Sequence, residues 1–443
     1  MRKLFTGILI LTLCFAVLGF GQAKKWQFVK VFPDTTVSFN TGLHGIAVDP
    51  DGKIWVGPAG TQPKDTLSNG KATAAIYVYN PDGTEAAISR IKIINTPGAS
   101  DTLTSLCRGM RTAPDGNIVY CGIGGFVFKI NYKTGVGIQK VNPVAPAVAS
   151  GIAPAFTSTG EMFTGHVLPG NPVKIWDPTF GSLGTAIASS EGYSRTVEVS
   201  KDGNDIYWCG YDKRHVKIYH SDVGTLGTYA LKDSFAVGMQ VESAGWNPSN
   251  TLLYLSSGTM DTTDYGVPPV NPPWTALTWY GFDVTTKKQM DSLTWNLAAY
   301  PYAVGAGGTL GPRPRGHAFS KTGDTIYVVC YNHAKAAMQM FRRVTVGVAP
   351  VSNLIPNGYT LSQNYPNPFN PTTEIQFTIP TAGYTTVKVY DMLGKEVATL
   401  VDEHLNPGTF KTTLDASKLS SGTYVYTLVS GTSRITKKMM LLK

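Results

Sequence analysis

Short apolar runs interrupted by polar turns recur along most of this chain. Residues 44–56 show the plan: an alternating run that begins at His44, a turn at Asp49-Pro-Asp-Gly52, and a second run, Lys53-Ile-Trp-Val56. Alternation with a period of two places apolar side chains on one face of a strand, and a tight turn between two such runs predicts a β-hairpin. No amphipathic helical stretch of convincing length breaks the pattern. The sequence therefore predicts an all-β protein.

The hairpin plan occurs six times between residues 24 and 345. The six turns are centred on Gly52, Gly116, Gly160, Gly203, Asn250 and Gly323. Equivalent positions lie about 43 to 73 residues apart, and four of the five steps match or exceed what a four-stranded propeller blade needs. Third strands are expected at residues 76–79, 127–130, 173–176 and 216–219. Because one blade cannot bury both of its faces alone, such repeats close into a ring, and we predict a six-bladed β-propeller.

Three further expectations follow from the same pattern. Residues 26–32 can supply the outer strand of the last blade and so close the ring. The intervals 44–108 and 242–315 are long enough to contain a seventh blade, so the pattern allows six or seven. At Asp115-Gly116 we expect a two-residue turn.

The repeats carry a family resemblance in residues 45–56, GIAVDPDGKIWV, and residues 200–208, SKDGNDIYW. These segments resemble the NHL, YVTN and gluconolactonase-like propellers. The resemblance supports the fold, but it does not assign a function, because such propellers include enzymes, ligand binders and scaffolds.

The first strand of each propeller blade lines the central channel, so residues that open these strands are expected to converge there. The positions eight residues before the turns are His44, Arg108, Ile152, Arg195, Glu242 and Arg315. Three arginines and a histidine against one glutamate suit a carboxylate, phosphate, sulfate or acidic sugar. Alternatively, Glu242 and backbone carbonyls satisfy the arginines, which then form a polar plug between the blades.

Features that would identify an enzyme are sparse. Gluconolactonase-like propellers that hydrolyse lactones hold a metal with carboxylate and amide groups in the channel, whereas this ring offers only Glu242. Glu198 lies three residues into a neighbouring repeat. The chain has no CxxCH, HExxH, GxSxG or Walker motif, so haem, zincin, esterase and NTPase chemistry lack their required residues. We assign no catalytic residue, metal or cofactor, and the pattern favours a protein that is not an enzyme.

A proline-rich insertion follows Gly258. It contains four prolines, and its aromatic residues are Tyr265, Trp274 and Trp279. Exposed, these rings would stack on sugars or contact a protein partner. Folded back, they would cover the propeller face.

Residues 354–443 form a second all-β segment. It opens with Asn364-Tyr-Pro-Asn-Pro-Phe-Asn-Pro371, whose prolines exclude a regular strand. Apolar alternation follows at Ile375, Phe377 and Ile379 and recurs in later strands. Short strands at this spacing predict an antiparallel sandwich of about ninety residues.

This segment is similar to the type A C-terminal sorting domain of the type IX secretion system. The resemblance is carried by the proline-rich opening, the strand-turn-strand at 388–397, the turn at 419–424 and the lysine-rich terminus. Its motif residues are Pro366, Asn367, Pro368, Phe369, Gly394, Gly422, Lys437 and Lys438. The resemblance implies an immunoglobulin-like sandwich in a bacterial protein, recognition by the outer-membrane translocon, and removal on release or on anchoring to surface lipopolysaccharide.

The N-terminus is typical of a secretory signal. Arg2 and Lys3 precede an apolar run from Leu4 to Phe20, and small residues follow before Lys24, so cleavage after Ala23 is expected. The predicted organisation is a signal peptide at 1–23, a propeller at 24–345, a linker at 346–353 and a sorting domain at 354–443.

The charge excludes one class of partner. The net charge of +9 is spread without a Lys/Arg block, which argues against nucleic acid and allows an anionic surface, small anion or glycan. We therefore expect an extracellular or outer-membrane surface protein that binds a ligand or acts as a protein-interaction scaffold. The alternatives are a secreted hydrolase or lyase that acts on a carbohydrate or lactone in the channel, and a structural matrix component.

Overall fold

A computed structural model describes residues 24–34, 39, 42–58, 62–103, 107–122, 125–143, 151–258, 273–299, 312–331, 338–345, 349–352, 356–405, 407–417 and 419–443. The chain divides into two compact units, Trp26–Arg343 and Val344–Lys443. The predicted signal peptide lies outside the described residues.

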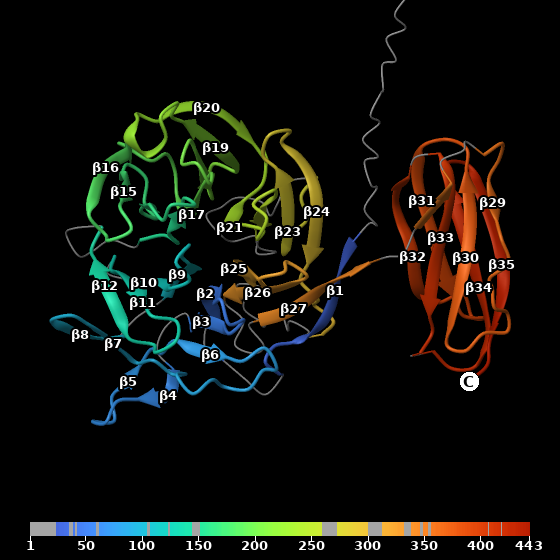
Figure 1. Ribbon diagram of the computed structural model, residues 1–443, viewed down its shortest axis with the longest axis horizontal. Helices are drawn as coiled ribbons and strands as arrows, with labels where there is room; N and C mark the ends of the chain where they lie inside the picture. Colours follow the sequence, from blue (N-terminus) through green and yellow to red (C-terminus); the bar gives the residue numbers. More distant parts are fainter. Residues whose placement is uncertain are drawn as a thin grey trace, which may run out of the picture. The chain divides into compact units, whose positions relative to one another are not determined.

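In the first unit, the described residues contain six sheets arranged around a common centre, each with its first strand innermost (Figure 1). The first blade contains β2 (Leu43–Val48), β3 (Ile54–Pro58) and β6 (Tyr77–Tyr79). The second contains β9 (Cys107–Thr112), β10 (Ile118–Gly122), β11 (Val127–Ile130) and β12 (Gly137–Val141). The third contains β13 (Ala155–Phe156), β14 (Met162–Thr164), β15 (Val173–Trp176) and β16 (Ser182–Ile187). The fourth contains β17 (Ser194–Val199), β18 (Asp205–Gly210), β19 (His215–His220) and β20 (Ala230–Phe235). The fifth contains β21 (Val241–Trp246), β22 (Leu253–Ser257), β23 (Thr278–Asp283) and β24 (Lys288–Thr294).

The sixth blade closes the ring. It contains β25 (Arg313–Phe319), β26 (Thr325–Tyr331) and β27 (Met338–Thr345), and its outer strand is β1 (Lys24–Val31) from the start of the chain. This arrangement confirms both the six-bladed propeller and the closure by the N-terminal strand. The long interval after the first hairpin contains two small hairpins, β4 (Gln62–Thr66) with β5 (Ala72–Thr73) and β7 (Ile93–Thr96) with β8 (Ala99–Thr102), and no further blade among its described residues.

The six repeat turns share one geometry. In each, the N–H of the turn residue donates to the carbonyl three positions earlier, and the turn residue has φ between 52° and 98°. Glycine adopts this left-handed conformation at low cost and asparagine tolerates it, which explains Asn250 among five glycines. In the second blade Ala113 pairs with Asn117 around a three-residue loop, so the expected two-residue turn at Asp115-Gly116 is wrong.

The apolar core of this unit lies between blades. Six buried clusters occupy the six junctions between neighbouring sheets in the described residues. Trp55 of the first blade packs with Met110 and Tyr120 of the second, and Phe163 of the third packs with Trp208 of the fourth. Each sheet thus buries its apolar side chains against its neighbours, as expected for radially stacked repeats.

The second unit is a sandwich of two four-stranded antiparallel sheets. One contains β28 (Ala349–Ser352), β33 (Gly408–Asp415), β30 (Thr372–Ile379) and β29 (Thr360–Leu361), and the other β32 (Glu396–Leu405), β31 (Gly383–Tyr390), β34 (Gly422–Ser430) and β35 (Ser433–Leu441). The predicted alternation is confirmed, because Ile375, Phe377 and Ile379 are fully buried in the shared core. The stretch 346–353 was expected to be a linker, but residues 349–352 form β28, which pairs with β33.

Candidate functional site

The inner strands share an irregularity that shapes the channel. In five blades the pairing register of the first strand shifts by one residue at the equivalent place. A residue inserted in this way re-aims the side chains on either side of it. In a regular strand, positions eight and five residues before a turn point to opposite faces. Here both Arg108 and Arg111 reach the channel, so it is lined at two levels, which we call the ring end and the turn end.

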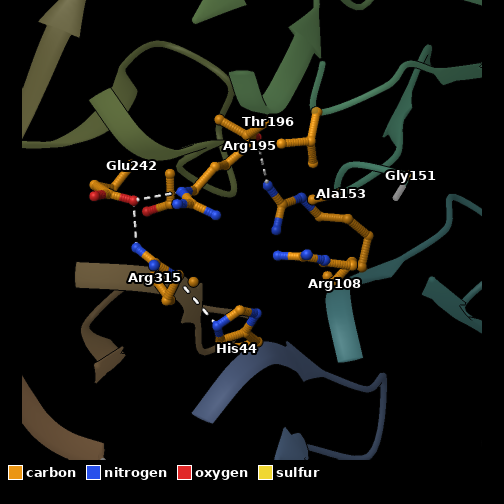
Figure 2. Close-up of a pocket in the computed structure, with 13 residues that line it drawn as sticks. His44, Arg108, Gly151, Ala153, Arg195, Thr196, Glu242 and Arg315 are labelled. Atoms are coloured by element: carbon orange, nitrogen blue, oxygen red, sulfur yellow. Dashed lines mark hydrogen bonds and ion pairs between the residues drawn. The ribbon is translucent and has the colours of Figure 1, made fainter. Parts of the chain in front are cut away.

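Five of the six residues predicted to converge at the ring end do so. His44, Arg108, Arg195, Glu242 and Arg315 surround one small cavity, with their side chains directed toward one another (Figure 2). The expectation for Ile152 is wrong, because its side chain is buried in the cluster between the third and fourth blades. Gly151 and Ala153 line the cavity in its place.

Glu242 is the electrostatic centre of the ring end. Its side chain is fully buried, and its Oε2 lies 3.0 Å from Arg195 Nε and accepts a hydrogen bond from Arg315 Nη1. Arg315 Nε lies 3.4 Å from His44 Nε2. The two guanidinium groups also stack over aromatic rings, Arg195 over Tyr211 at 4.9 Å and Arg315 over Tyr331 at 5.1 Å. These contacts join residues of four blades.

Burial and mutual repulsion act on the charges of this cluster. Burial, reinforced by Arg315, Arg108 and Arg195, lowers the pKa of His44 well below its usual value, so this histidine is neutral. Burial lowers the pKa of Arg315 to about 10, with Glu242 opposing the shift. Arg315 therefore stays charged at neutral pH and needs the carboxylate beside it.

Little space remains between these side chains. The ring-end cavity has a volume of ≈ 20 Å³, which is room for about one water molecule. Small residues seven positions before the turns draw the inner strands together, and a Cβ added at Gly109 would lie 2.4 Å from the Cβ of Ala153. The geometry thus fits a polar plug between the blades.

The turn end of the channel is wider. It contains a cavity of ≈ 470 Å³ lined by residues from all six blades. Three half-buried aromatic side chains, Phe156, Trp246 and Phe319, contribute to its wall, and Thr157, Ser158, Lys201, Asn247 and Asn250 supply polar groups. Trp246 Nε1 donates to Val199 O at 2.9 Å, which fixes the indole between the fourth and fifth blades.

A buried ion pair also lines this cavity. Arg111 Nη2 lies 3.0 Å from Glu198 Oε1 and also donates to Ala244 O. Burial raises the pKa of Glu198, and the positive charge of Arg111 opposes that shift. The carboxyl is therefore easier to protonate than an ordinary glutamate.

His317 lines the same cavity. Burial, together with the charge of Arg111, lowers the pKa of His317 to about 3. Its Nε2 lies 3.2 Å from Gly245 O, and a carbonyl can only accept, so Nε2 carries the proton. A neutral histidine and a glutamate of raised pKa thus line the same cavity.

The sequence-based prediction did not include Arg111 or His317, and it mentioned Glu198 only as an acid in a neighbouring repeat, not as a site residue. A signal was present, because the residues five before each turn are Ala47, Arg111, Ala155, Glu198, Gly245 and Ala318. Two charged side chains among small ones mark a second level of the channel. This level was missed because an unbroken strand would turn it away from the channel.

The aromatic residues of the insertion are not brought together as a binding surface among the described residues. Tyr265 lies outside the described residues. Trp274 is half-buried, donates from Nε1 to Val237 O at 2.8 Å and packs on Tyr280. Trp279 lies in β23 and is fully buried, so its assignment to an exposed binding loop is wrong.

Two motif residues of the second unit contact the last strand of the chain. Phe369 is buried in the core, and its N–H donates to Met440 O at 2.9 Å. Asn367 Oδ1 accepts from Met440 N at 2.9 Å. Pro366, Pro368, Gly394, Gly422 and Lys438 are exposed, and Lys437 is half-exposed. The proline-rich opening is thus held against the last strand, β35.

A metal of the lactonase type does not fit the ring end. Glu242 is paired with two arginines, whose positive charges oppose a cation there. The described residues contain no group of three or more His, Cys, Asp or Glu side chains arranged to hold a metal ion. They likewise contain no helix with the length and apolar character needed to cross a membrane.

Comparison with known proteins assigns the second unit. Residues 363–442 match the family described as "Secretion system C-terminal sorting domain". The type IX sorting domain expected from the sequence is thereby confirmed. A domain of this kind implies interaction with the secretion machinery and export to the cell surface or extracellular space.

For the chain as a whole, the comparisons show only a distant structural similarity. The chain is similar to the solved structure of XC5397, a gluconolactonase from Xanthomonas campestris, with a TM-score of 0.47 and 12% identity over 70% of this chain and 89% of that one. No curated protein matches the chain. The propeller assignment rests on the six sheets themselves.

Proposed function

We propose that this exported protein is a ligand-binding propeller, and that its ligand is a neutral, hydroxyl-rich molecule of about saccharide size held at the turn end of the channel. The observation that carries the proposal is the ≈ 470 Å³ cavity, where half-buried aromatic side chains occur with a buried Arg–Glu pair. The volume lies within the range of small-molecule sites, about 300–1,000 Å³.

The chemistry of the lining supports a neutral ligand. The charges of Arg111 and Glu198 offset one another, and His317 is neutral. A hydroxyl group both donates and accepts hydrogen bonds, so it can bind between a guanidinium and a carboxylate. The faces of Trp246, Phe156 and Phe319 suit the apolar C–H faces of a sugar ring.

Delivery is the role of the second unit. After passage across the outer membrane, the sorting domain is removed and the propeller is either released or attached to the cell surface. The exposed prolines and lysines of the sorting motif, held on one edge by Phe369 and β35, are the residues that would meet the translocon.

Calorimetric titration with a panel of neutral mono- and disaccharides tests the binding proposal. Trp246→Ala removes an aromatic wall of the cavity, and we expect affinity to fall about tenfold or more. Trp274→Ala is the matched control, since it removes an indole of the same blade that does not line the cavity. Loss of binding in Trp274→Ala with none in Trp246→Ala would move the site to the insertion.

One observation favours a hydrolase or lyase as the second candidate. Glu198 and His317 line one cavity, and their pKa values are shifted in opposite directions. Displaced pKa values of this kind are typical of general acid–base pairs. Turnover of a bound saccharide or lactone that disappears in Glu198→Gln while binding persists would establish the enzyme. Binding without turnover in the parent protein would exclude it for that ligand.

A further inference from the structure

A separate pocket is lined mainly by residues of the third blade and shares no lining residue with the turn-end cavity. Its volume is ≈ 70 Å³. The residues that line it are Pro143, Thr164, Gly165, His166, Asn171, Pro172 and Lys174. None of these described lining residues is acidic.

Strand pairing places the polar side chains of the pocket together. Thr164 in β14 lies directly opposite Lys174 in β15, so their side chains are neighbours on one face of the sheet. His166 follows Thr164 by two positions and lines the same pocket. The three residues are therefore presented from one side of the blade.

The protonation of His166 follows from its surroundings. Leu168 N donates to His166 Nδ1 at 2.9 Å, so Nδ1 carries a lone pair and the proton of the neutral ring is on Nε2. The side chain is 3% exposed, and Nε2 is buried with no partner among the described residues. Burial, with the charge of Arg108, lowers the pKa of His166 and keeps the ring neutral. An N–H donor is thus buried in the pocket wall without an acceptor.

The neighbouring groups are donors as well. Trp176 Nε1 donates to Thr164 Oγ1 at 2.8 Å, which uses a lone pair of the hydroxyl and leaves its hydrogen to donate elsewhere. Asn171 Nδ2 donates to Leu168 O and Pro169 O at 3.2 Å and so fixes the loop that carries the pocket. Lys174 contributes a positive charge.

We infer that this pocket is a binding site for a small oxyanion, either inorganic sulfate or phosphate or the carboxylate of a small acid. His166, Thr164 and Lys174 all line this pocket and carry hydrogen-bond donors. About 15 Å³ would hold one water molecule, so the pocket has room for a larger ligand. Charge-assisted hydrogen bonds favour an anion over a neutral ligand here. The site is independent of the saccharide proposal, because it shares no lining residue with the turn-end cavity.

Thermal unfolding of the purified protein in sulfate, phosphate, acetate or chloride, at constant ionic strength, tests this inference. We expect sulfate, phosphate or acetate to raise the melting temperature with a saturable dose dependence, since a ligand of the folded state stabilises it by mass action. Saturation by sulfate or phosphate would assign the inorganic ion, and saturation by acetate alone would assign a carboxylate.

Lys174→Met should weaken the saturable effect about tenfold or more, because it removes the charge and a hydrogen bond. Lys133→Met is the matched control: it removes a lysine on an exposed turn and should leave the effect unchanged. A second readout is an NMR titration of the His166 ring, because the pKa of His166 should rise when the anion binds. An identical response to all four salts, a response unchanged in Lys174→Met, or the absence of both a melting shift and a change at His166 would overturn the inference.

Discussion

The two ends of the propeller channel are built from the same six strands but differ in charge and in space. At the ring end a buried glutamate joins two arginines around ≈ 20 Å³. At the turn end one Arg–Glu pair lines ≈ 470 Å³. A small residue seven positions before each turn lets the inner strands approach at the ring end, whereas the turn end is bordered by larger side chains such as Trp246 and Phe319.

Charge alone therefore does not mark a binding site in this channel. The ring end has the larger excess of arginine, yet Glu242 pairs with two of these arginines and little space remains between the side chains. The turn end has fewer charges, but these border an open volume with aromatic walls. The turn end is distinguished by its room for a ligand and by polar groups with shifted pKa values.

The largest expected effect comes from removing the carboxylate of the plug. Glu242→Gln leaves the charges of the buried Arg315 and the half-buried Arg195 without their partner, and we expect the free energy of unfolding of the propeller to fall by about 3–5 kcal/mol. Chemical denaturation measures this. The control is Glu191→Gln, which removes an exposed glutamate paired with Lys217 and should cost less than about 1 kcal/mol. Equal losses in the two variants would mean that the plug does not hold the blades together.

The second-largest expected effect is a loss of propeller stability at low pH. The pKa values of His44 and His317 are lowered, so the unfolded chain binds protons that the folded protein does not, and stability falls as the pH drops below about 6.5. Each histidine contributes a slope of about 1.4 kcal/mol per pH unit. Urea unfolding at several pH values between neutral and mildly acidic measures the slope. His44→Gln should reduce it, and an unchanged slope would contradict the assignment of a neutral His44.

Close packing at the ring end predicts a moderate effect of a single methyl group. Gly109→Ala would place a Cβ 2.4 Å from Ala153 Cβ, and we expect a loss of about 1–3 kcal/mol from overpacking. Gly358→Ala is the control, because no atom lies within 4 Å of the added Cβ. Thermal melting of both variants measures the difference. A Gly109→Ala protein as stable as the control would show that the inner strands are less tightly packed than described.

The smallest effect is expected at the turn end. Glu198→Gln should cost about 1 kcal/mol, less than Glu242→Gln, because burial already disfavours the charged form of Glu198. Arg111 keeps its hydrogen bonds to Ala244 O and Met110 O in the variant. Denaturation of the two variants side by side checks the ranking. The reverse order would place the main electrostatic support of the channel at the turn end.

The fold could be predicted because its signals are local and repeated. Turn residues that need a left-handed conformation recur at Gly52, Gly116 and their equivalents, and period-two alternation marks the strands around them. The sorting domain was predictable for a further reason, since its prolines, Phe369 and terminal lysines occur in a fixed order.

The candidate site was predictable only in part. Counting back from the turns brought His44, Arg108, Arg195, Glu242 and Arg315 together, and the structure places them around one cavity. The count did not reveal how much space they leave, because that depends on packing at Gly109 and Ala153. It did not identify Arg111 or Glu198 as channel residues, because the extra residue in the inner strands of five blades reverses the facing expected from simple alternation. It also left out His317, which lies six residues before its turn.

A crystal structure of the protein bound to the neutral saccharide of highest affinity in the titration panel would show which end of the channel binds the ligand. We expect the sugar at the turn end, with a ring face against Trp246 and hydroxyl groups between Arg111 and Glu198. A sugar bound instead among Arg108, Arg195 and Glu242 would contradict this expectation, since the ring end would then be an opening and not a plug.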